Sequence, residues 1–156
     1  MEKNNTPVHS YFWQTSDFLA AIAVTIGFAI ETRHATTLNL PYNVFLGIAL
    51  WFFGFMIILA TKSQFKKHSQ KSSPGHAPDI LLSEGVFTYS RNPTYVGMVV
   101  IVVGFGILFD SWWLVGSSLL AAVLMHFILI LPEEIFLQNT FKEDFTKYRK
   151  KVRRWV

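Results

Sequence analysis

Four long runs of apolar residues divide the chain, and clusters of polar or charged side chains bound each of them. Within a run the hydrophobic residues are continuous and lack the period-two alternation of half-buried strands. A transmembrane barrel would need many alternating segments of about ten residues, whereas a helix satisfies its own backbone groups in lipid. The pattern therefore predicts four helical segments, at Phe18–Ile30, Tyr42–Ala60, Tyr95–Phe109 and Trp112–Leu131.

The lengths of these runs set what each can do in a bilayer. A membrane span takes about 20 residues, so the second and fourth runs are long enough alone. The first and third runs must include polar flanks or cross a thinned bilayer. Only Asp110 and Ser111 separate the last two runs. Such a short link predicts that the third and fourth helices pack as an antiparallel hairpin.

Composition agrees with a membrane protein. Hydrophobic residues make up 51% of the 156 residues and charged residues only 15%, where a soluble domain has about a quarter. We expect one all-α, polytopic membrane domain with about four transmembrane helices. The chain has no cysteine, which excludes a disulfide scaffold, a thiolate zinc site and a cysteine nucleophile. The basic residues flank apolar runs, so membrane lipids rather than nucleic acid are the expected partner.

The basic residues also predict the orientation. Of fourteen Lys and Arg, five lie between Lys62 and Arg91, seven follow Leu131 and one is Lys3, whereas only Arg33 falls in the loop before the second run. With four spans, the positive-inside rule places both termini in the cytoplasm. We expect a multi-pass protein of a bacterial inner membrane rather than of the endoplasmic reticulum.

This topology divides the single membrane domain into four parts. An amphipathic helix is predicted in the tail, because Phe141, Phe145 and Tyr148 recur at helical spacing among basic residues. It would lie against the lipid headgroups or cap the cytoplasmic face. The parts are an N-terminal helical pair (1–61), a cytoplasmic loop with a polar motif (62–94), the helical hairpin (95–131) and the cytoplasmic tail helix (132–156).

The polar motif Arg91-Asn92-Pro93-Thr94-Tyr95 stands where the chain enters the third run. Arg91 offers a planar fork of donors to a carboxylate, and Asn92 and Tyr95 add polar contacts. Pro93 suits the first helical turn, whose backbone N–H groups can bind an anion. The alternative interpretation is a simple interfacial stop, in which the arginine reaches the headgroups and the tyrosine anchors the helix.

Two carboxylates, Glu133 and Glu134, follow Pro132 at the end of the fourth run. Carboxylates near lipid are costly, and this pair would suit a ligand that carries a cation. The alternative is a solvated pair that partners the basic tail. The hairpin returns Glu133 to the level of Arg91, so an acid pair would face a guanidinium. That arrangement matches the zwitterion of an amino acid.

The histidines contribute less. His126 lies seven residues before Glu133 and could relay a proton, although an interhelical hydrogen bond is the commoner role. His68 and His76 lack the spacing of metal ligands, so no metal is expected.

Residues 79–155 resemble the isoprenylcysteine carboxyl methyltransferase and phospholipid methyltransferase superfamily of integral membrane proteins. The resemblance rests on Leu82-x-x-Gly85-Val86-Phe87, on the Arg-(His/Asn)-Pro-x-Tyr-x-Gly pattern from Arg91 to Gly97, on the tight hairpin, on the Glu133-Glu134 pair and on a tail with Phe141 and Tyr148. It implies S-adenosylmethionine as the methyl donor, bound at the cytoplasmic end of the last two helices.

The resemblance also implies residue roles. Asp79, Ile80, Leu81, Leu82 and Phe87 would line the adenosine side, and Asn92, Pro93, Thr94 and Tyr95 would hold the ribose and methionine portions. Glu133, beside Glu134, would face the ammonium group, and Arg91 would hold the carboxylate or brace the motif. Prenylcysteine enzymes place an arginine one turn before the acidic pair, where this chain has Leu129. The implied function is methyl transfer to a lipophilic or amphiphilic small molecule.

Two other classes of function remain open. Membrane-embedded reductases of related architecture use NADPH, although they are much larger. A non-catalytic membrane partner could carry the same polar motifs only to set its topology.

Overall fold

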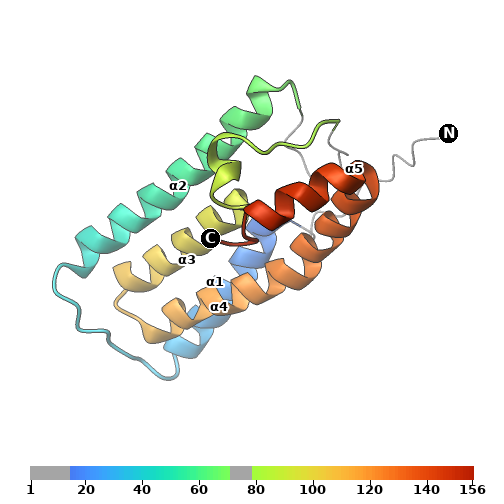
Figure 1. The fold of residues 1–156 in the computed structure, drawn as a ribbon. Coiled ribbons are helices and arrows are strands. Elements are labelled where there is room, and N and C mark those ends of the chain that lie inside the picture. The colour runs from blue at the N-terminus through green and yellow to red at the C-terminus, as the bar shows by residue number, and fades with distance from the viewer. Residues whose placement is uncertain (1–14, 71–78) are drawn as a thin grey trace.

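The structure is a computed structural model that describes residues 15–70 and 79–156. Within these ranges every regular element is helical, which confirms the all-α prediction for the described residues (Figure 1). The elements are α1 (Ser16–Glu31), α2 (Asn43–Lys67), a 3₁₀ turn (Gly85–Thr88), α3 (Pro93–Leu108), α4 (Trp112–Met125), a π-helical turn (His126–Ile130) and α5 (Leu131–Lys151).

Two of the described helices are long and apolar enough to cross a membrane. They are α2 and the continuous helix from Trp112 to Lys151, and the most apolar window of each has a mean hydropathy of 2.4. Helix α3 is apolar but shorter. At 1.5 Å per residue its sixteen residues rise about 24 Å, less than the roughly 30 Å of a hydrocarbon core. That α1 and α3 also cross the membrane remains a prediction of the sequence. The same holds for the prediction that the tail lies on the cytoplasmic side.

Helix α3 lies between α2 and α4, and α1 packs mainly on α4 (Figure 1). Glycines let α2 and α3 approach closely. A Cβ atom built on Gly54 would lie 2.6 Å from the carbonyl oxygen of Gly97, and one on Gly97 would lie 2.7 Å from the carbonyl oxygen of Gly54. The two backbones are therefore in direct contact at this level, as small residues allow in membrane helix pairs.

The hairpin between α3 and α4 turns as predicted. Asp110 adopts a left-handed conformation with φ of 54°, and Ser111 then accepts a hydrogen bond from the backbone N–H of Leu114 and caps α4. Ser111 also donates to Glu31 at the end of α1, and Glu31 accepts from the backbone N–H of Thr36 at 2.8 Å. These bonds join the α1–α2 loop to the hairpin at the end of the bundle opposite the tail.

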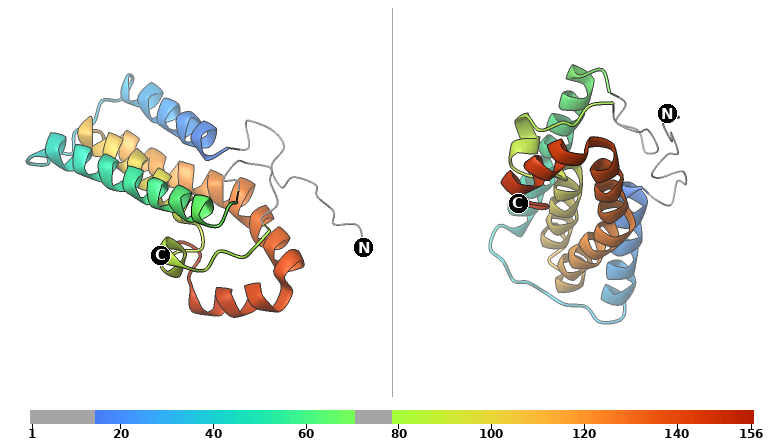
Figure 2. Two further views of the ribbon diagram at one scale, coloured as in Figure 1. Left: turned by 90° about the horizontal axis from the view of Figure 1, so that it is seen from above. Right: turned by 45° about the vertical axis from the view of Figure 1, so that its right-hand side comes forward.

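The tail folds back across the other end of the bundle (Figures 1 and 2). Helix α5 kinks at Lys142, where φ is 43°, and Gln138 donates across the kink to Lys142 O and Thr146 Oγ1, both at 3.0 Å. The returning half buries Phe145 and Tyr148. Of the two positions considered for the tail, this packing favours the cap over the end of the bundle.

Two helix boundaries differ from the sequence pattern. The apolar run stops at Ala60, but α2 continues to Lys67. A helix once formed propagates easily through residues of good helix propensity such as Lys and Gln, and Phe65 in this extension packs against the cluster of Phe87, Phe145 and Tyr148. Conversely, the predicted tail helix ends at Lys151, and the last five residues are not helical.

Candidate functional site

The Arg91–Tyr95 motif forms a tight turn into α3. The hydroxyl of Ser90 accepts from the backbone N–H of Asn92 at 3.0 Å, and the backbone N–H of Tyr95 donates to Asn92 O at 3.1 Å. Pro93 has no N–H and begins the helix. Among the described residues this leaves the Thr94 amide without an acceptor in the first turn, so the helix start offers one free donor rather than several.

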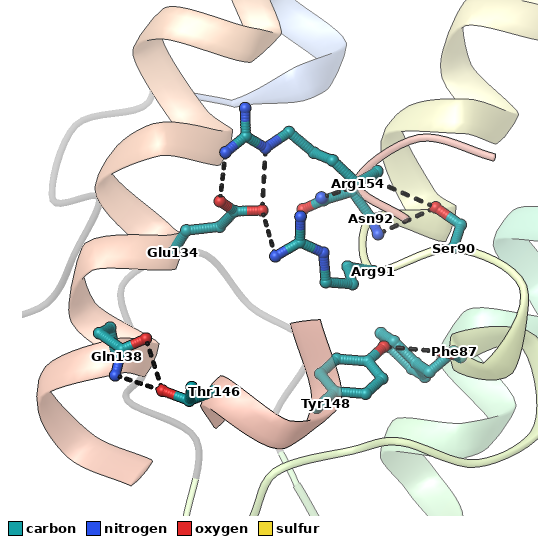
Figure 3. Close-up of polar contacts among 9 residues, drawn as sticks. All are labelled: Phe87, Ser90, Arg91, Asn92, Glu134, Gln138, Thr146, Tyr148 and Arg154. Atoms are coloured by element: carbon teal, nitrogen blue, oxygen red, sulfur yellow. Dashed lines mark hydrogen bonds and ion pairs between the residues drawn. The ribbon is translucent and has the colours of Figure 1, made fainter. Parts of the chain in front are cut away.

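The C-terminal segment is pinned to this motif. The backbone N–H of Arg91 donates to Arg153 O at 3.0 Å, and the Asn92 side-chain amide donates to Arg154 O at 2.9 Å. The Ser90 hydroxyl makes a longer contact to the same oxygen, at 3.4 Å (Figure 3). Residues more than sixty positions apart in the chain are thereby held together, and the side chain of Asn92 is committed to the tail.

The acidic pair meets the motif, and the two carboxylates have different partners. Tyr95 donates to Glu133 Oε1 at 2.6 Å. Arg154 donates from Nε and Nη2 to the two oxygens of Glu134, at 3.0 and 2.7 Å (Figure 3). Arg91 Nη1 lies 3.2 Å from Glu134 Oε1. The guanidinium and the acid pair therefore do come together, but Arg91 faces Glu134 and not Glu133.

Arg91 is a largely buried charge of the site. Its side chain is 11% exposed, and burial lowers its pKa, partly offset by the carboxylate of Glu134. In the described part of the chain, the buried Nε has no hydrogen-bond partner, and the buried Nη1 makes only its ion pair with Glu134. The hydrogen bond to Glu134 instead raises the pKa of Arg154. The Arg91 Nε thus has donor capacity for a ligand.

An apolar wall stands beside these charges. Phe87 lies in the 3₁₀ turn and packs with Phe145 and Tyr148, and Leu81 and Leu82 pack against the same cluster. The Tyr148 hydroxyl donates to Phe87 O at 2.7 Å. Burial raises the pKa of Tyr148 to about 12, and Arg91 acts in the opposite direction. The tail thus fixes both the polar and the apolar parts of the site.

The structure does not gather all residues named from the sequence. Asp79 and Ile80 are exposed, and within the described ranges Asp79 makes no hydrogen bond or ion pair. Ile80 contributes its carbonyl oxygen to Gln70 at 2.9 Å. The remaining named residues lie together: Leu81, Leu82, Phe87, Arg91, Asn92, Pro93, Thr94, Tyr95, Glu133 and Glu134.

Sequence reasoning missed two members of the site, Ser90 and Arg154. The alternative that the acid pair partners the basic tail is confirmed for Glu134, which pairs with Arg154, although the sequence did not single out this arginine. Its neighbours Arg153 and Trp155 carry no local sign that one arginine turns inward. The hint lay in the acid pair, for which the basic tail was one of the partners considered.

Residues 42–144, about two thirds of the chain, match the phospholipid methyltransferase family. The chain belongs to this family. Part of it is also 33% identical to the protein-S-isoprenylcysteine O-methyltransferase of Schizosaccharomyces pombe, over 75 residues that make up 47% of this chain. The aligned segment spans only 31% of that relative. The superfamily expected from the sequence is therefore confirmed.

Proposed function

We propose that this chain transfers a methyl group from S-adenosylmethionine to a lipophilic small molecule at the membrane face that carries its tail. One observation carries the proposal: Arg91 is buried beside an acidic pair, and its Nε has no hydrogen-bond partner among the described residues. In a chain of the phospholipid methyltransferase family, such a guanidinium suits the carboxylate of the donor's amino acid portion.

The residues present fit this donor. Arg91 and the Thr94 amide would bind its carboxylate, and Glu133, oriented by Tyr95, would accept from its ammonium group. The wall around Phe87 would pack against the adenosine. When bound, S-adenosylmethionine supplies an electrophilic methyl group on a sulfonium. The protein's own contribution is then to align the acceptor with that methyl group and to exclude water.

The surface of the helices favours an acceptor that arrives from lipid. Leu119, Val123 and Phe127 form an exposed apolar stripe along α4 and the π-turn, at 72%, 51% and 64% exposure. The name of the yeast relative describes O-methylation of an S-isoprenylcysteine, which is itself lipophilic. We propose for this chain an acceptor with an apolar chain, whose reacting group reaches the site beside the tail.

Titration calorimetry in detergent micelles tests the proposal. The wild-type protein should bind S-adenosylhomocysteine, which has the same amino acid portion as the donor, and should not bind NADPH. Glu133→Gln should weaken this binding by at least about 1.5 kcal/mol, roughly tenfold, because a charge-assisted hydrogen bond is lost. Glu143→Gln is the matched control, since Glu143 lies on the same helix and is exposed.

Each outcome has a definite meaning. Binding of NADPH alone would indicate a reductase, and binding of neither compound would indicate a non-catalytic partner. Binding of S-adenosylhomocysteine with equal affinity by a folded Glu133→Gln variant would remove Glu133 from the ammonium site.

A further inference from the structure

His126 opens the π-helical turn between α4 and α5, inside the apolar helix. Its ring contacts two others: Phe127, with centroids 5.0 Å apart, and Trp155 of the tail, stacked at 6.5 Å with an interplanar angle of 21°. Within the described ranges the imidazole makes no hydrogen bond or ion pair, so the interhelical hydrogen bond considered from the sequence is not formed. A polar side chain inside an apolar helix costs free energy in a membrane, and such residues commonly have a functional role.

The π-turn decides which carboxylate His126 lies above. In an uninterrupted α-helix, residues seven apart share a face, which would align His126 with Glu133. A π-turn holds one extra residue and moves this alignment on by one, to Glu134. Contacts with the tail support this shift. Arg154 binds Glu134, and the next residue, Trp155, stacks on His126. His126 therefore lies on the face that the site and the tail cover.

His126 also lies at the edge of the lipid-facing surface. Its neighbour Phe127 is 64% exposed, whereas Met125 and Leu129 are buried in the core. The histidine itself is half-buried between them. A molecule whose apolar chain lies along the exposed stripe can therefore present its head group to the imidazole.

An imidazole suits some head groups of the methyl acceptor better than others. A carboxylate has no proton to give and would need a cation, but Arg154 is already paired with Glu134 and Arg91 is proposed to hold the carboxylate of the donor. An alkylammonium ion titrates about four pH units above imidazole, which makes imidazole a poor base for it. A thiol titrates only about two units above imidazole, and the thiolate is the reactive nucleophile.

We propose that the methyl acceptor is a lipophilic thiol and that His126 is the base that accepts its proton; this inference rests on the proposed function. The S–H proton passes to the imidazole, and the electron pair left on sulfur forms the new bond to the methyl carbon. The bond between that carbon and the donor sulfur breaks, and its electron pair stays on the donor sulfur, which becomes a neutral thioether. The imidazolium then releases the proton to water.

Two probes with the same chain length separate the head groups: decanethiol and decanoate. His126→Ala should lower kcat/KM for methylation of decanethiol by at least about a hundredfold, the lower end of the range for loss of a general base. Its affinity for S-adenosylhomocysteine should stay within twofold of wild type. His34→Ala, which removes an exposed histidine at the opposite end of the bundle, should leave both quantities unchanged.

A binding measurement on the wild-type protein adds a readout that needs no turnover. In the complex with S-adenosylhomocysteine, decanethiol should shift the NMR signals of the ¹⁵N-labelled His126 ring, which are the histidine signals that persist when each of the other four histidines is replaced by glutamine. Decanoate should not shift them. Because this uses the wild-type protein, the test stands even if His126→Ala does not fold.

Failure of the proposed function and failure of the proposed role of His126 give different results. If the wild-type protein does not bind S-adenosylhomocysteine, the proposed function fails and the role of His126 fails with it. If it binds, but does not methylate decanethiol, or does so equally well without His126, only the thiol and its base are overturned. The same holds if decanoate, and not decanethiol, shifts the His126 signals.

Discussion

Arg154 donates hydrogen bonds of 3.0 and 2.7 Å to the two carboxylate oxygens of Glu134, which lies twenty residues earlier in the chain. The same residue accepts hydrogen bonds from Asn92 and Ser90 through its backbone oxygen. One residue near the C-terminus thus connects the acidic pair with the motif at the start of α3. The tail is therefore a structural part of the site.

Arg154→Ala should destabilise the protein by about 1.5–3 kcal/mol, the range for hydrogen bonds to a charged group, because Glu134 is only 12% exposed and loses its main partner. Thermal unfolding in detergent micelles measures the loss. Arg153→Ala is the control, because that side chain is exposed and its backbone oxygen still accepts from Arg91. Equal melting temperatures for the two variants would contradict a clamp at Glu134.

Tyr148 should make stability depend on alkaline pH. Its folded pKa is about 12, above the ordinary value of 10, so the folded state holds the phenolic proton more tightly than the unfolded chain. The stabilisation is complete below about pH 10 and is lost as pH rises toward 12. Tyr148→Phe should be less stable at neutral pH, by about 1 kcal/mol for the lost bond to Phe87 O, and should lose less stability over this interval.

The control for this measurement is Tyr89→Phe, because Tyr89 is 79% exposed. Its denaturation curves between pH 9 and 12 should follow those of the wild-type protein. A Tyr148→Phe variant that shows the wild-type pH dependence would mean that other groups cause the alkaline loss.

Ser111→Ala should destabilise the opposite end of the bundle by about 1–2 kcal/mol. The substitution removes the N-cap of α4 and a hydrogen bond to Glu31 at a fully buried position. Ser118→Ala, also buried, removes only a bond to a carbonyl of its own helix and should cost less. Chemical denaturation of the two variants compares them directly, and a larger loss for Ser118→Ala would refute the importance of this junction.

Low pH should weaken the hydrogen bonds of Glu31 at the same junction and so lower the stability of the protein. Hydrogen bonds from Ser111 and Thr36 hold the pKa of Glu31 below its usual range. Because the folded pKa is depressed, the stabilisation is present above the ordinary value and is lost as pH falls through the folded value. Glu31→Gln should therefore lose less stability than the wild-type protein when denaturation is compared at pH 5 and pH 3.

Gly54→Ala should separate α2 from α3. The new Cβ would lie 2.6 Å from the carbonyl oxygen of Gly97, and backbone cannot yield as a flexible side chain can. We expect the free energy of unfolding to fall by about 1–3 kcal/mol, as for overpacked cores. Gly116→Ala meets no atom within 4 Å and should be neutral or slightly stabilising. Thermal unfolding of both variants checks the difference, and a stable Gly54→Ala protein would contradict direct backbone contact.

Much of the site could be anticipated because its residues lie in two short segments. Arg91 to Tyr95 begin one helix, and Glu133 and Glu134 end the apolar part of another, so a tight hairpin necessarily brings them to one level. What a hairpin alone could not specify is the pairing of charges. Glu133 and Glu134 are adjacent, and the π-turn and the returning tail determine which of them faces Arg91.

The continuous apolar runs and the two-residue link determined by themselves that this chain forms helices with a tight hairpin, because in lipid each helix must satisfy its own backbone. Tertiary structure alone decided that α2 extends past Ala60, that α5 bends at Lys142 and that Arg154 closes on Glu134. These features depend on contacts between residues far apart in sequence, whose energies exceed local propensity and leave no periodic trace in the chain.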